Sequence, residues 1–114
     1  MDLEEQLRQV YAAFNARDVD SILARAALDV DWPNAWEGGR VHGHEGIRQY
    51  WRRQWETIDP SVEPTGFEAR PDGRIAVSVH QVVRDLDGTL LAESDVRHVY
   101  SFRDDLIARM DVEE

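Results

Sequence analysis

Apolar residues near the start of the chain recur every three or four positions, which is the spacing of an amphipathic helix. This spacing predicts a first helix over residues 2–16, and Asp2 with Glu5 forms a capping box at its start. Asp18 or Asp20 can cap a second, shorter helix, which we expect to pack against the first. The apolar positions of this second helix are Ile22, Leu23, Ala26 and Ala27.

The next segment contains a short strand, a loop and a third helix. Residues 29–32 favour a strand that Pro33 ends, and residues 34–43 favour a loop. Apolar side chains at helical spacing predict the third helix over residues 44–57. This part of the chain also holds all four tryptophans, which are Trp32, Trp36, Trp51 and Trp55. Such a concentration of large flat side chains indicates either a pocket wall or an ordinary part of the core.

From Pro60 onward the apolar pattern changes to the alternation that is typical of strands. We expect strands at residues 62–69, 75–84, 89–102 and 106–112. Turn signals separate them, and Asp87 followed by Gly88 is the strongest. Helices followed by an antiparallel meander predict an α+β fold. A chain of 114 residues has room for one such domain, so we assign residues 1–114 to a single domain.

The length of the strand at residues 89–102 predicts the shape of the sheet. A straight strand of this length would span roughly 45 Å, which is more than the width of a small domain. The strand must therefore bend, and we expect a bulge near residues 92–95. The helices then have to cover the concave side, because their apolar stripes need a partner. The result is a cone-shaped cavity between sheet and helices that opens near the loop after Trp32.

The same strand carries a histidine on an apolar face. Alternate residues of a strand face the same way, so His98 shares its face with Val96, Tyr100 and Phe102. Burial there should lower the pKa of His98 and favour the neutral imidazole. A neutral imidazole can accept a proton or donate a hydrogen bond to a developing oxyanion. The alternative is a core histidine that is bonded to a carbonyl or to Tyr100.

Composition excludes several classes of function. The 23 acidic and 13 basic residues give a formal charge of −10, which argues against nucleic acid as a partner. The chain has no cysteine, so thiol catalysis and disulfides are excluded. The acidic start lacks the pattern of a signal peptide and no segment resembles a membrane span, so we expect a cytoplasmic protein without a membrane partner.

Four segments together resemble the SnoaL-like proteins of the nuclear transport factor 2-like superfamily. They are Phe14–Asp18, Gly43–Trp51, His98–Asp104 and Ile107–Met110. This superfamily also includes ketosteroid isomerases, polyketide cyclases and dehydratases. The resemblance implies an NTF2-like, cystatin-like fold, in which a curved antiparallel sheet wraps around the N-terminal helices. It does not fix the function, because this scaffold hosts unrelated activities.

The resemblance is partial at the functional positions. The isomerase general base is an aspartate just before a proline, and here Trp32 precedes Pro33. The tyrosine of the first helix in those enzymes aligns with Val10, beside Tyr11. Their oxyanion-hole aspartate aligns with His98, which agrees with the alternation argument.

These observations define a candidate pocket for a small, largely apolar carbonyl compound. The candidate acid, base or donor residues are His98, Tyr100 and Asp31. The candidate ligand-binding residues are Trp32, Trp36, Tyr50, Trp51, Trp55, His80, Val96 and Met110. His80 is ambiguous, since the more apolar face of its strand is the opposite one. We expect no metal and no cofactor, because the pair His42 and His44 lies at a loop-to-helix junction and not in a strand barrel.

Two functions fit this pocket. The first is cofactor-independent isomerisation, cyclisation or dehydration through His98. The second is a non-catalytic ligand-binding or dimerisation module. Epoxide hydrolysis is a weaker third, because Asp95 and Arg97 share what we expect to be the outer face. We also expect a homodimer, since Val99 and the valines of the preceding strand would otherwise form an exposed apolar patch.

Overall fold

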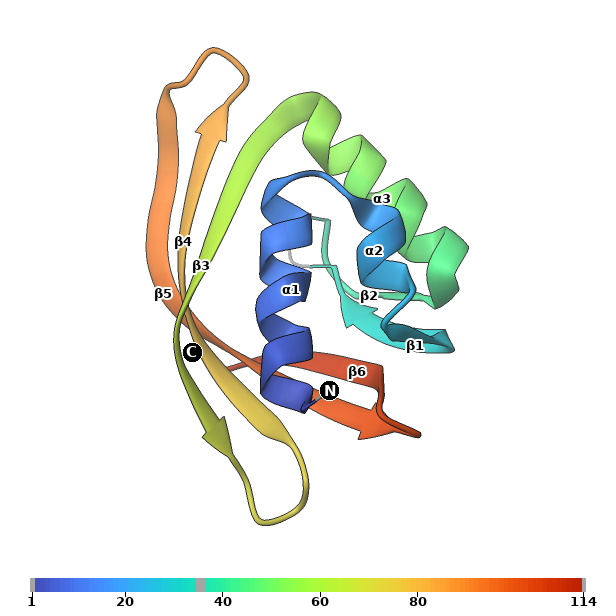
Figure 1. Ribbon diagram of the computed structural model, residues 1–114. Helices are drawn as coiled ribbons and strands as arrows, with labels where there is room; N and C mark the ends of the chain where they lie inside the picture. Colours follow the sequence, from blue (N-terminus) through green and yellow to red (C-terminus); the bar gives the residue numbers. More distant parts are fainter. Residues whose placement is uncertain (1, 35–36, 114) are drawn as a thin grey trace.

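The computed structural model describes residues 2–34 and 37–113. Three helices lie inside a strongly curved sheet (Figure 1). The helices are α1 (Leu3–Asn15), α2 (Val19–Leu23) and α3 (Gly43–Thr57). The strands are β1 (Ala26–Pro33), β2 (Arg40–His42), β3 (Ile58–Ala69), β4 (Ile75–Asp85), β5 (Leu90–Arg103) and β6 (Leu106–Glu113).

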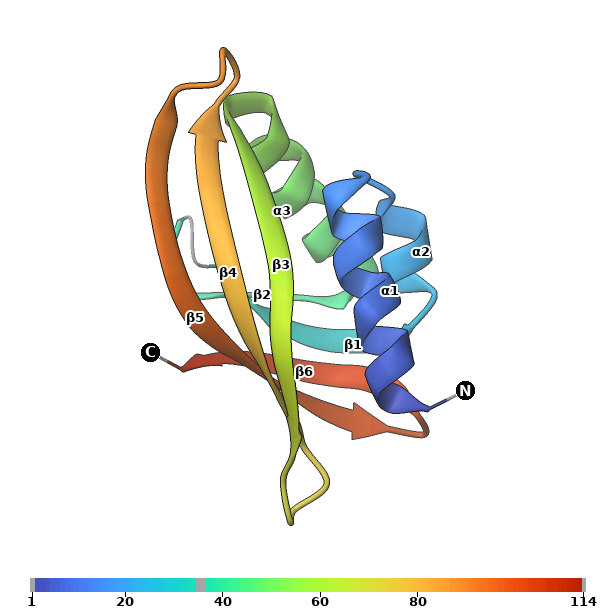
Figure 2. The same ribbon diagram turned by 60° about the vertical axis from the view of Figure 1, so that its left-hand side comes forward.

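The six strands form one sheet in the order β2-β1-β6-β5-β4-β3. Strands β3 to β6 make the predicted antiparallel meander, while β1 joins it parallel to β6. The long strands β3, β4 and β5 bend around the helices, which cover the concave face (Figure 2). The predicted α+β fold is therefore confirmed.

The second helix is shorter than the sequence predicted. Ala26 and Ala27 do not continue α2 but begin β1. Ala26 pairs with Ile107 of β6, and the Ile107 N–H donates to the Arg25 carbonyl at 2.9 Å. This ladder to the far end of the chain outweighs the helical preference of alanine. The predicted loop at residues 34–43 likewise contains the short strand β2, which pairs with β1.

The bulge predicted near residues 92–95 lies directly before them, at Leu91 in β5, while residues 92–95 pair in regular register with β4. Further irregularities lie at Thr65 in β3 and at Ala108 in β6. The long strands therefore each depart from regular pairing at their own position. Pro60 and Pro64 are accommodated because β3 is an edge strand, where a missing N–H leaves no ladder bond unmade.

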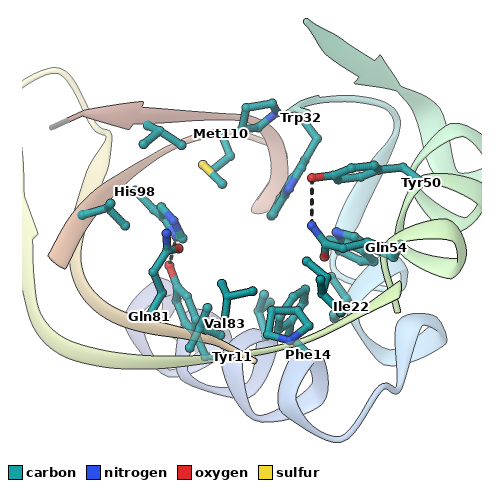
Figure 3. Close-up of a pocket in the computed structure, with 18 of the residues that line it drawn as sticks. Tyr11, Phe14, Ile22, Trp32, Tyr50, Gln54, Gln81, Val83, His98 and Met110 are labelled. Carbon is teal, nitrogen blue, oxygen red and sulfur yellow. Dashed lines mark hydrogen bonds between the residues drawn. The ribbon is translucent and has the colours of Figure 1, made fainter. Parts of the chain in front are cut away.

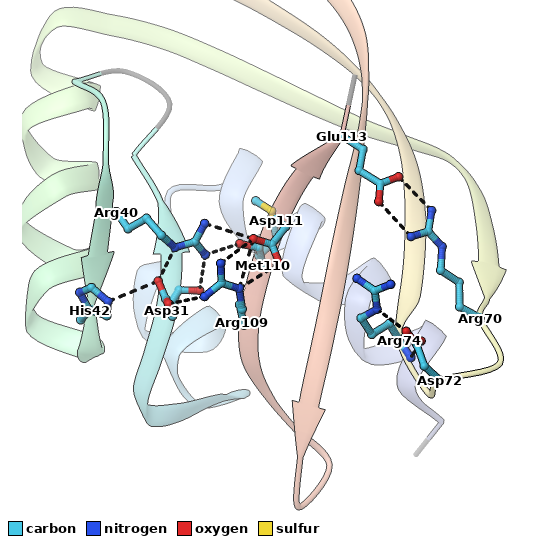
Figure 4. Close-up of polar contacts among 10 residues, drawn as sticks. All are labelled: Asp31, Arg40, His42, Arg70, Asp72, Arg74, Arg109, Met110, Asp111 and Glu113. Carbon is cyan, nitrogen blue, oxygen red and sulfur yellow. Dashed lines mark hydrogen bonds and ion pairs between the residues drawn. The ribbon is translucent and has the colours of Figure 1, made fainter.

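Val99 is not part of an exposed apolar patch, contrary to expectation. Its side chain is fully buried, and the valines Val77 and Val79 of β4 face the core. Val99 pairs with Ala76 and Asp111, so these three share the outer face. Ion pairs of long arginine side chains lie on that face, and their aliphatic stems can cover apolar surface (Figure 4). A homodimer stays a prediction, but exposed valines no longer provide an argument for it.

The helices also close the free edge of the sheet. The Asn15 side chain, at the end of α1, donates from Nδ2 to the Val62 carbonyl at 2.7 Å. Its Oδ1 accepts from the Val62 N–H at 2.9 Å. One amide thus occupies both outward backbone groups of Val62 on the edge strand β3, which both fixes α1 and protects the edge.

This contact generates a prediction about stability. We expect Asn15→Ala to lower the free energy of unfolding by about 1–2 kcal/mol, because two hydrogen bonds are lost at an exposed site. Urea unfolding followed by tryptophan fluorescence measures this change. Hydrogen exchange should also show faster exchange of the Val62 amide.

The matched control is Gln6→Ala on the same helix. Among the described residues the Gln6 side chain has no hydrogen-bond partner, so we expect a change within about 0.5 kcal/mol. An Asn15→Ala protein that is as stable as Gln6→Ala, with unchanged Val62 exchange, would show that the contact does not hold α1 to the sheet.

Candidate functional site

A cavity of about 290 Å³ lies between the concave face of the sheet and the helices (Figure 3). All three helices contribute to its wall, as do β1, β3, β4, β5 and β6. Its volume is close to the lower end of the roughly 300–1,000 Å³ that is usual for small-molecule sites. The exposed lining residues Ala92 and Val112 place an opening beside β5 and β6. Pro33, at the start of the loop that follows β1, lines the cavity as well.

The wall is largely apolar and carries no charge. Among the described residues that line the cavity there is no aspartate, glutamate, lysine or arginine. The polar side chains there, apart from tryptophan, are Tyr11, Tyr50, Gln54, Gln81, His98 and Tyr100. An ion would lose its hydration in such a site without gaining a partner charge. The cavity therefore suits a neutral ligand.

A chain of two hydrogen bonds connects the tyrosines to His98. The Tyr100 hydroxyl donates to the Tyr11 oxygen at 2.8 Å. The Tyr11 oxygen in turn lies 2.8 Å from His98 Nδ1. Tyr11 and Tyr100 are almost completely buried, and the Tyr11 and His98 rings stack at 5.9 Å between centroids. The chain joins α1 to β5 across the deep end of the cavity.

The bond from Tyr100 favours one tautomer of His98. Each tyrosine has one proton to donate. Tyr100 donates to Tyr11, so the arrangement that uses both protons has the Tyr11 hydroxyl donating to His98 Nδ1. In this tautomer Nδ1 accepts and Nε2 carries the hydrogen. Among the described residues Nε2 has no hydrogen-bond partner, so this N–H is available to a ligand.

Burial determines the protonation states. It lowers the pKa of His98 to about 4, so the imidazole is neutral near pH 7, as the sequence predicts. Burial, together with the neighbouring Tyr100, raises the pKa of Tyr11 well above its ordinary value. Burial also raises the pKa of Tyr100, although the bond to Tyr11 acts in the opposite direction. All three groups are neutral near pH 7, so His98 is able to donate a hydrogen bond and is only a weak base.

A second polar group lies across the cavity from His98 (Figure 3). Gln54 Nε2 donates to the Tyr50 hydroxyl oxygen at 3.2 Å, and both residues belong to α3. Near His98, Gln81 on β4 directs its Nε2 to Ser94 Oγ at 3.2 Å.

Most of the sequence-predicted site residues line this cavity. They are His98, Tyr100, Trp32, Tyr50, Trp51, Val96 and Met110. Trp55 is not among the lining residues but packs behind them, with its ring 5.8 Å from that of Trp51 and 5.5 Å from that of Phe14. Trp36 lies outside the described residues.

Asp31 is on the outer face of the sheet, away from the cavity (Figure 4). Its carboxylate accepts from Arg40 Nε at 2.5 Å and from Arg109 at 2.7 Å. Burial alone would raise the pKa of Asp31, but the hydrogen bond and charge of Arg40, with the charges of Arg109 and His42, lower it overall. Alternation along β1 explains this position, because Trp32 faces inward.

His80 is also outside the cavity. Its Nδ1 lies 2.8 Å from Asp95 and its Nε2 lies 2.7 Å from Glu93. The hydrogen bonds to Asp95 and then to Glu93 raise the pKa of His80, whereas burial lowers the pKa of His98. The inward positions of β4 are taken by Gln81 and Val83, which line the cavity.

Three polar lining residues are absent from the sequence-based candidates, namely Tyr11, Gln54 and Gln81. Tyr11 lies in the apolar stripe of α1, so its spacing is that of a core residue and does not reveal that it lines the cavity. Gln54 follows Tyr50 by one helical turn, so helical spacing could have found it. Gln81 could have been found by its two-residue spacing from the inward-facing Val79 and Val83.

No metal site is evident in the described part of the chain, where no cluster of three histidine, aspartate or glutamate side chains has suitable geometry. His44 Nε2 lies 3.0 Å from the Ala26 carbonyl oxygen, which fixes α3 to β1. Within the described ranges, no helix is both long and apolar enough to cross a membrane.

Several solved structures have a fold that is similar to that of this chain. TerC, crystallised with polyporic acid, is 28% identical over 97% of this chain and 89% of that chain, with a TM-score of 0.84. An NTF2-like protein of unknown function from Burkholderia pseudomallei is 26% identical over 99% and 91%, with a TM-score of 0.85. A cystatin-fold protein from Novosphingobium aromaticivorans is 25% identical over 100% and 99%, with a TM-score of 0.81.

A comparison with curated proteins found no match. The family comparison is decisive for the classification. A SnoaL-like domain model matches residues 7–110, which is nearly the whole chain and includes most of α1, all of α3 and the strand that carries His98. The chain therefore belongs to the SnoaL-like domain family.

Proposed function

We propose that the cavity binds a flat, neutral carbonyl compound and that His98 donates its Nε2 hydrogen to the carbonyl oxygen. The observation that carries this proposal is the chain from Tyr100 through Tyr11 to His98 Nδ1, which leaves one N–H at an uncharged apolar cavity. The family membership and the crystallisation of TerC with polyporic acid support a small organic ligand.

The hydrogen-bond chain makes His98 an effective donor. Hydrogen bonds in series polarise one another, and fixed donors in a dry site stabilise a developing oxyanion far better than water does. Tyr11 is a positioning residue, since it fixes the tautomer of His98. Tyr100 has the same role for Tyr11.

Among the reactions open to such a site, cyclisation or dehydration fits better than isomerisation. Isomerisation by proton transfer between carbons needs a base of suitable pKa. No carboxylate is among the described lining residues, and Trp32 occupies the position before Pro33. When the nucleophile is an enol or hydroxyl of the ligand itself, its O–H proton passes to the solvent, so an intramolecular addition to a carbonyl needs no carboxylate and gains directly from a donor at the carbonyl oxygen.

A non-catalytic ligand-binding role is the second candidate. The observation that favours it is the same lack of a strong base, since the pKa of His98 is about 4. In this case His98 only orients the ligand. Turnover of a bound compound distinguishes the two functions.

The electrostatics of His98 generate the first prediction. We expect His98 to titrate by NMR near pH 4 and His80 to titrate above its ordinary pKa of 6.5. The unfolded chain binds a proton at His98 between pH 6.5 and about 4 while the folded chain does not. Stability should therefore fall as the pH drops through this range, and His98→Gln should remove that part of the slope.

The nitrogen chemical shifts of His98 provide the check on the tautomer. They should show hydrogen on Nε2 in the wild type and a mixture of tautomers in Tyr11→Phe. A His98 that titrates at its ordinary pKa, or that carries its hydrogen on Nδ1, contradicts the proposed donor.

Ligand polarisation generates the second prediction. We expect 1-tetralone, a neutral flat ketone, to quench the fluorescence of Trp32 and Trp51 and to bind about 3- to 10-fold more weakly to His98→Phe. The infrared carbonyl band of the bound ketone should lie at lower wavenumber in the wild type than in His98→Phe. His80→Gln, on the outer face, is the matched control and should bind the ketone like the wild type.

The third prediction separates catalysis from binding. Heptane-2,6-dione cyclises through its enol, which forms in buffer: the enol carbon adds to the second carbonyl, the enol O–H proton passes to the solvent and the new alkoxide oxygen is protonated. Loss of water then gives an enone, whose absorbance reports the rate. We expect the wild type to accelerate this reaction and His98→Phe to lose at least about 100-fold of the acceleration. Binding of 1-tetralone without any acceleration selects the non-catalytic function.

A further inference from the structure

The pair of Tyr50 and Gln54 forms a second hydrogen-bonding end of the cavity. The two residues are one turn apart on α3, so their side chains lie on the same face of the helix. Figure 3 shows them on the side opposite to His98 and Gln81. The cavity therefore has a polar group at each of two ends.

The Gln54 amide is suited to recognise a neutral oxygen group. A glutamine side chain offers two N–H donors and one carbonyl acceptor. One donor is used by the bond to the Tyr50 oxygen at 3.2 Å, which fixes the amide plane. The remaining donor and the acceptor have no partner among the described residues, and Gln54 lines the cavity, so a hydroxyl or a second keto group there can use them.

The space between the two ends is apolar. Trp32 and Met110 lie on one side of it, with Phe14, Ile22 and Val83 on the other (Figure 3). A ligand that spans the cavity therefore needs an apolar ring in its middle. A charged substituent at either end would find no opposite charge among the described lining residues.

We infer that Gln54 is a specificity-determining residue, and that the ligand is a neutral ring compound with a carbonyl at the His98 end and a hydroxyl or second keto group at the Gln54 end. This inference rests on the proposed function, because His98 defines the carbonyl end. It adds to that function the requirement for a second oxygen substituent.

Two probes that differ in one hydroxyl group test the inference. They are 1-tetralone and 6-hydroxy-1-tetralone, in which the hydroxyl is para to the carbonyl. We measure dissociation constants at pH 6, where both probes are neutral. The wild type should bind the hydroxylated ketone about 3- to 10-fold more tightly, which corresponds to one hydrogen bond. Gln54→Leu should bind both ketones equally and should keep the affinity for 1-tetralone.

Gln49→Leu is the matched control on the same helix. The Gln49 amide bonds to Glu45 at 3.1 Å on the exposed side and does not line the cavity, so the wild-type preference should persist. The side-chain amide resonances of Gln54 in the wild type provide a measurement that needs no variant. They should shift with the hydroxylated ketone and not with 1-tetralone.

The outcomes separate this inference from the proposed function. Suppose that the wild type binds 1-tetralone with a polarised carbonyl but does not prefer the hydroxylated ketone. The proposed hydrogen bond between the ligand and Gln54 is then wrong, while the His98 donor is supported. If Gln54→Leu keeps the preference, the assignment to Gln54 is wrong. If neither ketone binds, both the inference and the proposed function fail.

Discussion

The curvature of the long strands is the constraint on which the rest of the structure depends. A straight strand of 14 residues would measure about 46 Å, more than the longest dimension of the molecule, which is 41 Å. Strands β3, β4 and β5 therefore bend together, and the concave side receives the apolar stripes of the helices. Helices of fixed width cannot fill a curved sheet completely, so a cavity is left. The candidate site is a consequence of this mismatch.

Within that cavity, buried polar groups must find partners from distant parts of the chain. The hydroxyls of Tyr11 and Tyr100 would each cost free energy if they were left unbonded in the core. They satisfy one another and end at His98. The same bonds that stabilise the core therefore orient the imidazole, so the structural role of Tyr11 and the role proposed for it coincide. The outer face contrasts with this arrangement, since its charged side chains are paired around Asp31 and Arg40.

The uncharged lining of the cavity restricts the possible reactions more than the fold does. The fold family hosts several activities, so membership alone does not choose among them. The lack of a charged lining residue in the described ranges and the position of Trp32 argue against proton transfer by a carboxylate, and the low pKa of His98 argues against the imidazole as a strong base. A single well-placed N–H favours recognition and polarisation of a carbonyl oxygen.

The sequence by itself determined the features that depend on local periodicity. Helical spacing located α1 and α3, two-residue alternation located β4, β5 and β6, and the length of β5 required a curved sheet. Alternation also placed His98 and Tyr100 on the inward face, and the pKa shift followed from that burial.

Only the tertiary structure decided what depends on contacts between distant segments. Ala26 became a strand residue because Ile107 pairs with it, and Val99 is buried although it lies on the outer face of the sheet. The partnership of Tyr11 with His98 spans 87 positions in the sequence, and no local pattern encodes it. Periodicity specifies which way a side chain faces, whereas the partner that it meets there depends on how the whole chain is folded.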